Sequence, residues 1–253
     1  RDVAPSRGLG DVYKRQEEAS VLCFTDGNTI VPMISAQDHK RISDGDMGAN
    51  TGGMGAYAPA PVMTKELDKI VYDTILLPAV KAMKKEGCPF KGCLYAGLMI
   101  TKDGPQVVEF NCRFGDPETE AILPLLESDL AKIMLACTKG TLKKERVEWK
   151  NACAVDIVLA SEGYPATHSS GEEIVGLEEA KKTGCLVFHA GSMKKKGRYF
   201  VNGGRVLNVA AVAPTLKEAR DKAYEGVSKI SWRGMQYRHD IADKGLTRLK
   251  KRK

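Results

Sequence analysis

Residues 107–121 read VVEFNCRFGDPETEA, and this stretch joins an expected strand to an expected helix through a Gly-Asp-Pro turn. Successive side chains on a strand point to opposite faces. One face of this strand therefore carries Val107 and then three polar side chains: Glu109, Asn111 and Arg113. The opposite face is predicted to pack on the core of the protein: Val108, Phe110 and Cys112.

The polar face could hold a metal ion. Glu109 and Asn111 are about 7 Å apart along the strand, given a rise of about 3.3 Å per residue, and both can lean toward one cation. Ligation by a few protein oxygens suits Mg²⁺. Arg113 would offer a forked cation to a phosphate or a carboxylate. An exposed strand face that carries a Glu–Arg pair explains the same residues, and the strand alone leaves both interpretations open.

The Gly-Asp-Pro turn also has two interpretations. Asp116 at the N-cap, Pro117 at the first helical position and Glu118 in the first turn are ordinary choices for starting a helix. The N-terminus of a helix is also a place where anionic ligands bind. The two interpretations are compatible, because a capping residue can face a site.

A glycine-rich loop is the second candidate constellation. Asp38, His39, Lys40 and Arg41 precede NTGGMGAY (50–57), in which three glycines let the backbone approach a ligand closely: Gly52, Gly53 and Gly55. Cationic side chains beside flexible amides suit a polyphosphate, although a surface turn with incidental charge is the simpler account. The chain has no Walker A sequence and no dinucleotide fingerprint.

The rest of the chain alternates strand and helix patterns. We predict hairpins over 19–34, over 93–111 and over 198–213, and a buried strand over 152–161. One helix is predicted over 64–86, broken near Pro78 and ended by Gly87. A second is predicted from Pro117 to about Thr138, and a third follows the Thr215–Glu218 capping box. The part after residue 150 shows little obvious chemistry.

Composition narrows the function classes. The 253 residues are 43% apolar and 28% charged, which is typical of a globular protein, and no apolar run could cross a bilayer. The net charge of +7 depends on residues 244–253, a basic tail that we predict to be a solvated end. We therefore expect no nucleic-acid or membrane partner. Seven unpaired cysteines without metal-site spacing indicate reduced thiols and a cytoplasmic location.

Five motifs together resemble one family. They are QDHKR (37–41), NTGGMGAY (50–57), YAGLM (95–99), EFNCRFGDPETEA (109–121) and ASEGYP (160–165). Their order and spacing are similar to those of the glycinamide ribonucleotide synthetases (phosphoribosylamine–glycine ligases), ATP-grasp enzymes of purine synthesis. The resemblance runs from about Glu17 to about Asp243, and RFGDPE is its most specific motif.

The resemblance implies a fold class and a domain plan. The class is α+β: the C-terminal lobe of an ATP-grasp domain, mainly antiparallel sheet with helices, over residues 17–143, then a small α+β C-terminal domain over 150–243. Residues 1–16 form neither a secretory signal nor a periodic element, and we interpret them as a foreign, adapter-like segment.

The resemblance also implies a reaction and a site. ATP would phosphorylate the carboxylate of glycine, and the amine of 5-phosphoribosylamine would displace phosphate, giving glycinamide ribonucleotide, ADP and Pi. Glu109 and Asn111 would bind Mg²⁺ or Mn²⁺, and Arg113 and Asp116 would act at the reacting centre. The implied ATP-binding residues are His39, Lys40, Arg41 and Glu109. The implied substrate-binding residues are Asn50, Thr51, Gly52, Gly53, Gly55, Arg113, Gly115, Asp116, Pro117 and Glu118.

Family members carry an N-terminal domain and a further ATP-grasp part, with the adenine pocket and a phosphate-binding lysine, ahead of the position of Glu17. We expect these parts to pack on this chain, and we expect the chain alone to bind ATP poorly and not to ligate. Two alternatives stay open: another ATP-grasp carboxylate–amine ligase of purine synthesis, and a non-catalytic piece of a multifunctional purine protein.

Overall fold

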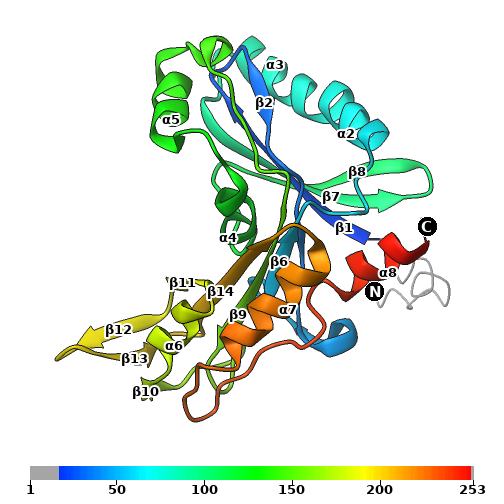
Figure 1. The fold of residues 1–253 in the computed structure, drawn as a ribbon. Coiled ribbons are helices and arrows are strands. Elements are labelled where there is room, and N and C mark those ends of the chain that lie inside the picture. The colour runs from blue at the N-terminus through cyan, green and yellow to red at the C-terminus, as the bar shows by residue number, and fades with distance from the viewer. Residues whose placement is uncertain (1–16, 252–253) are drawn as a thin grey trace, which may run out of the picture.

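The computed structural model describes residues 17–251 (Figure 1). The segment 1–16, interpreted above as foreign, lies outside the described residues. The strands are β1 (Glu17–Thr25), β2 (Ile30–Pro32), β3 (Gln37–Asp38), β4 (Arg41–Ser43), β5 (Met47–Asn50), β6 (Gly55–Ala58), β7 (Gly92–Thr101), β8 (Gly104–Asn111), β9 (Cys153–Ala160), β10 (Ser170–Ile174), β11 (Leu186–His189), β12 (Ser192–Lys195), β13 (Arg198–Asn202) and β14 (Arg205–Ala213). The helices are α2 (Lys65–Val71), α3 (Leu77–Lys85), α4 (Glu118–Ile122), α5 (Leu130–Lys139), α6 (Leu177–Lys182), α7 (Leu216–Val227) and α8 (Asp243–Lys251).

The first sheet is antiparallel, in the order β2-β1-β7-β8. Alternate side chains of β1 and β7 pack in two different hydrophobic clusters, one on each face of the sheet. Val21 and Ala96 lie in a cluster with α2 and α3, while Leu22 and Tyr95 lie in a second cluster with α4 and α5. Helices therefore cover both faces of this sheet (Figure 1). The predicted hairpins over 19–34 and 93–111 are confirmed by the pairing of β1 with β2 and of β7 with β8.

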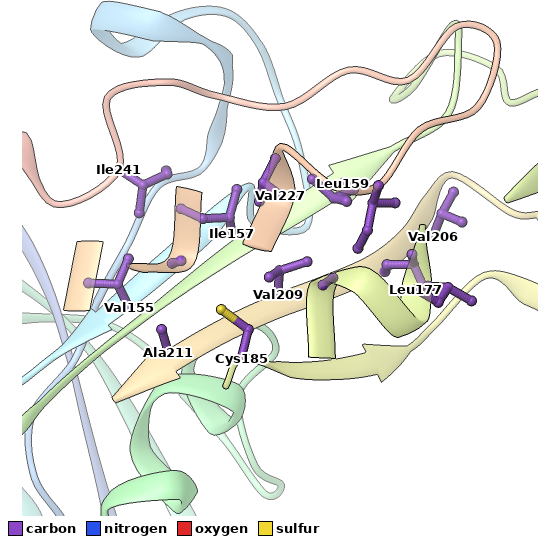
Figure 2. Close-up of a cluster of buried hydrophobic side chains, with 14 of the residues drawn as sticks. Val155, Ile157, Leu159, Leu177, Cys185, Val206, Val209, Ala211, Val227 and Ile241 are labelled. Atoms are coloured by element: carbon purple, nitrogen blue, oxygen red, sulfur yellow. The ribbon is translucent and has the colours of Figure 1, made fainter. Parts of the chain in front are cut away.

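The second sheet joins the two predicted domains. Its order is β11-β14-β9-β6-β3, so two strands from before residue 60 pair in one sheet with strands from after residue 150. Val155, Ile157 and Leu159 of β9 face a core formed with α7 and α6 (Figure 2). Ala154 of the same strand lies in the core that α4 and α5 share with the first sheet. The α+β fold class is as predicted, and the domain boundary at 143–150 stays a prediction.

Smaller elements complete the molecule. β10, β13 and β12 form a three-stranded sheet that extends away from the body, and β4 and β5 form a hairpin (Figure 1). The hairpin predicted over 198–213 is wrong, because β13 pairs with β10 and β12 whereas β14 pairs with β11 and β9. The predicted capping box is present at the start of α7, where Thr215 Oγ1 accepts from the Glu218 N–H and the Thr215 N–H donates to the Glu218 carboxylate. None of the seven cysteines forms a disulfide.

The helix predicted over 64–86 is present but interrupted. A π-helical turn, η2 (Tyr72–Leu76), separates α2 from α3, and Pro78 lies in the first turn of α3. Proline provides no N–H and its ring crowds the preceding turn, so the wider π turn lies where the break was predicted. Thr64 caps the start of α2 by accepting from the Leu67 N–H.

The single helix predicted over 117–138 is wrong. The chain forms α4, then a 3-10 turn, η3 (Leu123–Leu125), and then a new helix, α5, whose N-cap is Asp129. Pro124 ends the first helix, because a proline cannot continue the backbone hydrogen-bond ladder. The predicted end at Gly140 is confirmed, since this glycine has a φ of 73° at the C-cap of α5.

Two further sequence predictions are corrected. The predicted core face of β8 is exposed: Val108 is 63% and Phe110 46% accessible, and Cys112 is exposed as well. β8 is the last strand of its sheet, and a register shift opposite Gly97 and Leu98 leaves Val108 as an extra residue.

The basic tail predicted from residue 244 is not a simple solvated end, because α8 covers Asp243–Lys251 and buries Gly245.

Candidate functional site

The end of β8 opens into a small polar cavity. It is lined by Asp38, Lys40, Gly52, Tyr95, Glu109, Asn111, Arg113, Gly115, Asp116 and Glu118. These residues come from four places in the chain: the start of the glycine-rich loop, its Gly52 turn, strand β7, and the stretch that follows the middle of β8. The fold therefore brings the two constellations predicted from the sequence to one place.

The predicted metal pair lies at the rim of this cavity. Glu109 is exposed and opposes Gly97 of β7, and Asn111 opposes Tyr95. The Asn111 Nδ2 lies 3.1 Å from the Glu109 Oε1, so the two side chains lean toward one point. The orientation of an amide follows from its hydrogen bonds, and a half-turn of the Asn111 amide would present its oxygen beside the carboxylate. A carboxylate and an amide oxygen at one point fit a hard divalent cation.

The turn after β8 differs in detail from an ordinary helix start. Pro117 occupies the N-cap of α4 and no side chain caps this helix. Asp116 instead forms an ion pair, with its Oδ1 2.9 Å from the Arg205 Nη1. Arg113 is exposed and donates to the Phe114 carbonyl at 2.8 Å. The N-cap role predicted for Asp116 is therefore wrong, and its carboxylate is held at the cavity wall by a residue far along the chain.

Glu118 forms the floor of the cavity. It is 2% exposed, and its Oε1 accepts from the Ser20 hydroxyl at 2.7 Å and the Tyr95 hydroxyl at 2.9 Å. Gly115 lies so close that an added Cβ would be 2.4 Å from the Glu118 Oε2. A larger residue at position 115 would therefore displace this carboxylate.

A second buried carboxyl lies beside the first. Burial, followed by the nearby charge of Glu118, raises the pKa of Asp38 to about 8 against the opposing effect of Lys40. The Lys40 Nζ is 3.3 Å from the Asp38 Oδ2. Burial pushes the pKa of Lys40 down, but the carboxylates of Asp38 and Glu118 outweigh burial and raise it. The cavity thus combines one well-supported cation with two buried carboxyl groups.

The other predicted site residues do not belong to the cavity lining: His39, Arg41, Asn50, Thr51, Gly53, Gly55 and Pro117. The Thr51 hydroxyl accepts from the Gly53 N–H at 2.9 Å and donates to the Lys40 carbonyl at 2.8 Å, so it closes the loop. Arg41 is exposed and donates to the Gly48 carbonyl at 2.7 Å.

His39 is an interior residue. It is 1% exposed, and its Nδ1 lies 3.3 Å from the Gly55 carbonyl oxygen. Burial, reinforced by the charge of Arg238, lowers the pKa of His39 to about 3, so the ring is neutral. A neutral, buried imidazole can contact the glycine-rich loop through the Gly55 carbonyl, but it offers no charge to a phosphate.

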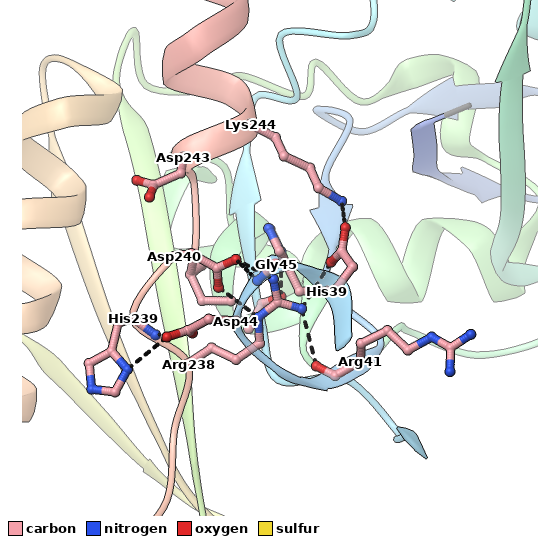
Figure 3. Close-up of polar contacts among 12 residues, drawn as sticks. His39, Arg41, Asp44, Gly45, Arg238, His239, Asp240, Asp243 and Lys244 are labelled. Carbon is pink, nitrogen blue, oxygen red and sulfur yellow. Dashed lines mark hydrogen bonds and ion pairs between the residues drawn. The ribbon is translucent and has the colours of Figure 1, made fainter. Parts of the chain in front are cut away.

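The β4–β5 hairpin is fastened to the C-terminal part of the chain through Arg238 (Figure 3). This guanidinium is fully buried and donates to both carboxylate oxygens of Asp240 at 2.7 Å, to Asp46 at 3.0 Å and to the Arg41 carbonyl at 3.1 Å. Burial opposes ionisation of Asp240, but the Arg238 hydrogen bonds win and hold the pKa of this carboxyl well below its usual range.

Two family models match the chain. The ATP-grasp (A) domain of phosphoribosylglycinamide synthetase matches residues 12–119, and the C domain of the same enzyme matches residues 154–244. The chain belongs to the phosphoribosylglycinamide synthetase family. The matched regions contain every residue that lines the cavity.

Relatives of known name agree with this membership. The chain is 53% identical over 234 residues to the trifunctional purine biosynthetic protein adenosine-3 of Gallus gallus, a match that covers 92% of this chain and 23% of that protein. It is 50% identical to the chloroplastic phosphoribosylamine–glycine ligase of Arabidopsis thaliana, covering 91% of this chain and 44% of the relative.

A solved structure supports the fold. The phosphoribosylamine–glycine ligase of Thermotoga maritima superposes with a TM-score of 0.78 at 39% identity, over 89% of this chain and 55% of that one. The chain thus spans about half the length of the single-function ligases and about a quarter of the trifunctional protein. Among residues 17–251, no helix has the length and apolar character needed to cross a bilayer.

Sequence reasoning about this phosphoribosylglycinamide synthetase chain missed four site residues: Ser20, Tyr95, Tyr164 and Arg205. Tyr95 and Tyr164 stand in motifs that carried the resemblance, YAGLM and ASEGYP, but neither received a role. Arg205 had a recognisable signal, because it is a cationic residue directly before the apolar run VLNVAAVA. Ser20 gave no signal, because a serine in an apolar strand has many explanations.

Proposed function

We propose that this chain supplies the metal-binding half of the active site of a ligase that joins glycine to 5-phosphoribosylamine and converts ATP to ADP and Pi. The observation that carries the proposal is the cavity in which Glu109, Asn111 and Arg113 meet the Gly52 turn and the Asp116–Glu118 turn. Family membership supports the reaction class. The identities of the substrates rest on what the named relatives are called.

The chemistry requires close charge control. The carboxylate of glycine attacks the γ-phosphate of ATP. Because both groups are negatively charged, they repel each other, and cations must offset this repulsion. A divalent ion on Glu109 and Asn111 supplies Lewis-acid stabilisation of the phosphate oxygens when it is bound. Arg113 and Lys40 are the cationic side chains of the cavity lining and offer further compensation.

The residues present fit such an ion. Residues 17–251 contain no group of three or more His, Cys, Asp or Glu side chains arranged around a metal position. Mg²⁺ commonly takes one or two protein oxygens and completes its shell with phosphates and water. The Glu109–Asn111 pair provides that number, and the same oxygen donors accept Mn²⁺.

Acyl transfer then needs dry surroundings. The amine of phosphoribosylamine displaces phosphate from glycyl phosphate, and water would compete for this acyl group. The Gly52–Gly53 turn and the Asp116–Pro117 turn wall the cavity on one side, and in this proposal they exclude water from the reacting carbonyl.

The unpaired cysteines support the cytoplasmic location predicted from the sequence.

The test uses a chimera in which residues 17–243 replace the matching part of the Thermotoga maritima ligase. We expect ADP release that depends on both glycine and phosphoribosylamine. Glu109→Gln should lower it about 100-fold or more, because the metal loses its charged ligand. Glu145→Gln, in the exposed segment after α5, is the matched control and should leave the rate unchanged. Equal rates for the two variants would sink the proposal.

We further propose that the 253-residue chain alone binds ATP poorly and does not ligate, since it spans about half of its single-function relatives. Release of ADP by this chain, dependent on glycine and phosphoribosylamine and exceeding that of its Glu109→Ala variant, would overturn this part.

A further inference from the structure

The Gly52–Gly53 turn is held from both sides by side chains from beyond residue 160. The Gly52 N–H donates to the Tyr164 hydroxyl at 2.9 Å. The Gly52 carbonyl accepts from the Arg205 Nη1 at 2.9 Å, and the Gly53 carbonyl lies 3.5 Å from the same nitrogen. The N–H and the carbonyl of Gly52 are therefore both hydrogen-bonded to residues after 150, the part of the chain for which the sequence indicated little chemistry.

The same guanidinium also holds the opposite turn. The Arg205 Nη1 lies 3.1 Å from the Asp116 carbonyl oxygen and 2.9 Å from the Asp116 Oδ1. The Arg205 side chain is 22% exposed, so water screens this ion pair only in part. One nitrogen therefore joins two turns that are more than 60 residues apart in the sequence.

These groups pack in close contact. A Cβ on Gly52 would lie 3.0 Å from the Arg205 Cζ, so the guanidinium stacks directly on the glycine backbone. A Cβ on Gly53 would lie 2.3 Å from the Pro117 Cδ, so the two turns touch. Gly204, next to Arg205, leaves no room for a Cβ beside the Tyr164 ring, where it would lie 2.4 Å from the Cδ2 atom.

We propose that Arg205 and Tyr164 are positioning residues of the site, which fix the Gly52–Gly53 turn against the Asp116–Pro117 turn and so set the shape of the cavity between them. Neither residue needs to touch a substrate for this role. The consequence for catalysis rests on the proposed function, whereas the consequence for the turn itself does not.

Hydrogen exchange of the backbone amides tests the structural half in the 253-residue chain. Tyr164→Phe removes one hydroxyl and keeps the ring on Gly204, and Arg205→Lys keeps the charge but loses the forked geometry. We expect amide exchange at Gly52 and Gly53 to rise about fivefold to tenfold in each variant, since each loses hydrogen bonds to the turn. Core amides of β1 and β9 should keep their rates.

Matched controls come from the same part of the chain. Tyr199→Phe on β13 and Arg233→Lys, at an exposed arginine in the loop after α7, make the same chemical changes away from the turn. Unchanged exchange at Gly52 and Gly53 in both test variants would overturn the proposal. So would a rise spread evenly over the chain, because that reports general destabilisation.

The catalytic half is measured in the chimera described above. Tyr164→Phe should lower kcat about tenfold, with a thermal midpoint equal to that of Tyr199→Phe. A faster-exchanging turn combined with an unchanged kcat would contradict a positioning role. A chimera that is inactive without any substitution would count against the proposed function alone, and the exchange rates would still decide the placement of the turn.

Discussion

Gly53 is the residue at which the two walls of the cavity meet most closely. Its φ is +119°, and an added Cβ would lie 2.3 Å from the Pro117 Cδ and 2.8 Å from the Asp38 Oδ1. Any side chain here must therefore push the Asp116–Pro117 turn away or distort the glycine-rich loop. The requirement for glycine comes from both the backbone conformation and the lack of space.

We predict that Gly53→Ala lowers the free energy of unfolding by about 2 to 4 kcal/mol, combining backbone strain with overpacking. Urea denaturation measures the change. Gly197→Ala is the matched control, because Gly197 has a φ of +79° with no atom within 4 Å of the added Cβ. It should cost only about 1 kcal/mol for the backbone. Equal costs at the two positions would show that the turns do not touch.

Glu120 predicts a pH dependence of stability. Burial, followed by the charge of Asp116, raises the pKa of Glu120 to about 7. An acid whose pKa is higher in the folded state than in the unfolded chain favours folding at low pH, and this contribution is lost as the pH rises from about 4.5 through about 7.

Glu120→Gln should therefore stabilise the protein at pH 8 by about 1 to 2 kcal/mol, after allowance for partial exposure, and have little effect at pH 4. Urea unfolding at the two pH values gives the difference. Glu145→Gln, at an exposed glutamate, is the control substitution. A Glu120→Gln variant that is less stable than the unsubstituted chain at pH 8 would contradict the raised pKa.

Strand β8 shows how an element can mislead. Its alternation placed Glu109 and Asn111 together, and the structure agrees, but the face assigned to the core is exposed. Hydrophobic alternation reports two faces of a strand and does not report which face is covered. At the edge of a sheet, coverage depends on what packs there.

The exposure of Phe110 gives a direct measurement. Phe110→Ser should change the free energy of unfolding by less than about 0.5 kcal/mol, as surface substitutions usually do. Leu22→Ala, in the buried core of the same sheet, should cost about 2 to 5 kcal/mol. A cost for Phe110→Ser that approaches the cost of Leu22→Ala would mean that this face is covered in solution.

Local signals were predicted well and distant ones poorly. The hairpins over 19–34 and 93–111, the Thr215–Glu218 capping box and the stop at Gly140 depend on neighbouring residues, and each is confirmed. The hairpin predicted over 198–213 failed, because β13 and β14 pair with strands of two different sheets. The roles of Arg205 and Tyr164 depend on contacts across more than 100 residues, which no local pattern encodes. The helix predicted over 117–138 is wrong because Pro124 interrupts the backbone hydrogen bonds, although the apolar periodicity continues past it.

At the scale of the whole molecule, the five-stranded sheet combines strands from both sides of the predicted domain boundary. β6 pairs with β9 across the predicted boundary, and β3 extends the same sheet. One face of β9 packs on α7, and the other face packs toward α4. Separating the chain in the 143–150 segment would leave β9 as an edge strand with an uncovered face.

We therefore predict that residues 150–243 do not fold alone. Expressed by itself, this piece should show poorly dispersed amide signals in NMR and a non-cooperative thermal transition. The 253-residue chain, measured alongside it, should unfold in one cooperative step. A well-dispersed spectrum from the piece would establish it as an independent domain.

The shared sheet also has a consequence for synthesis on the ribosome. About 95 residues separate the end of β6 from the start of β9. At roughly 5 to 20 residues per second, β3 and β6 leave the exit tunnel about 5 to 20 s before β9, the second partner of β6, exists. During that interval the glycine-rich loop between them has neither Tyr164 nor Arg205 to hold it. The nascent chain must therefore keep the open edge of β6 from misassociating, and the site can take shape only after translation has passed the start of β14.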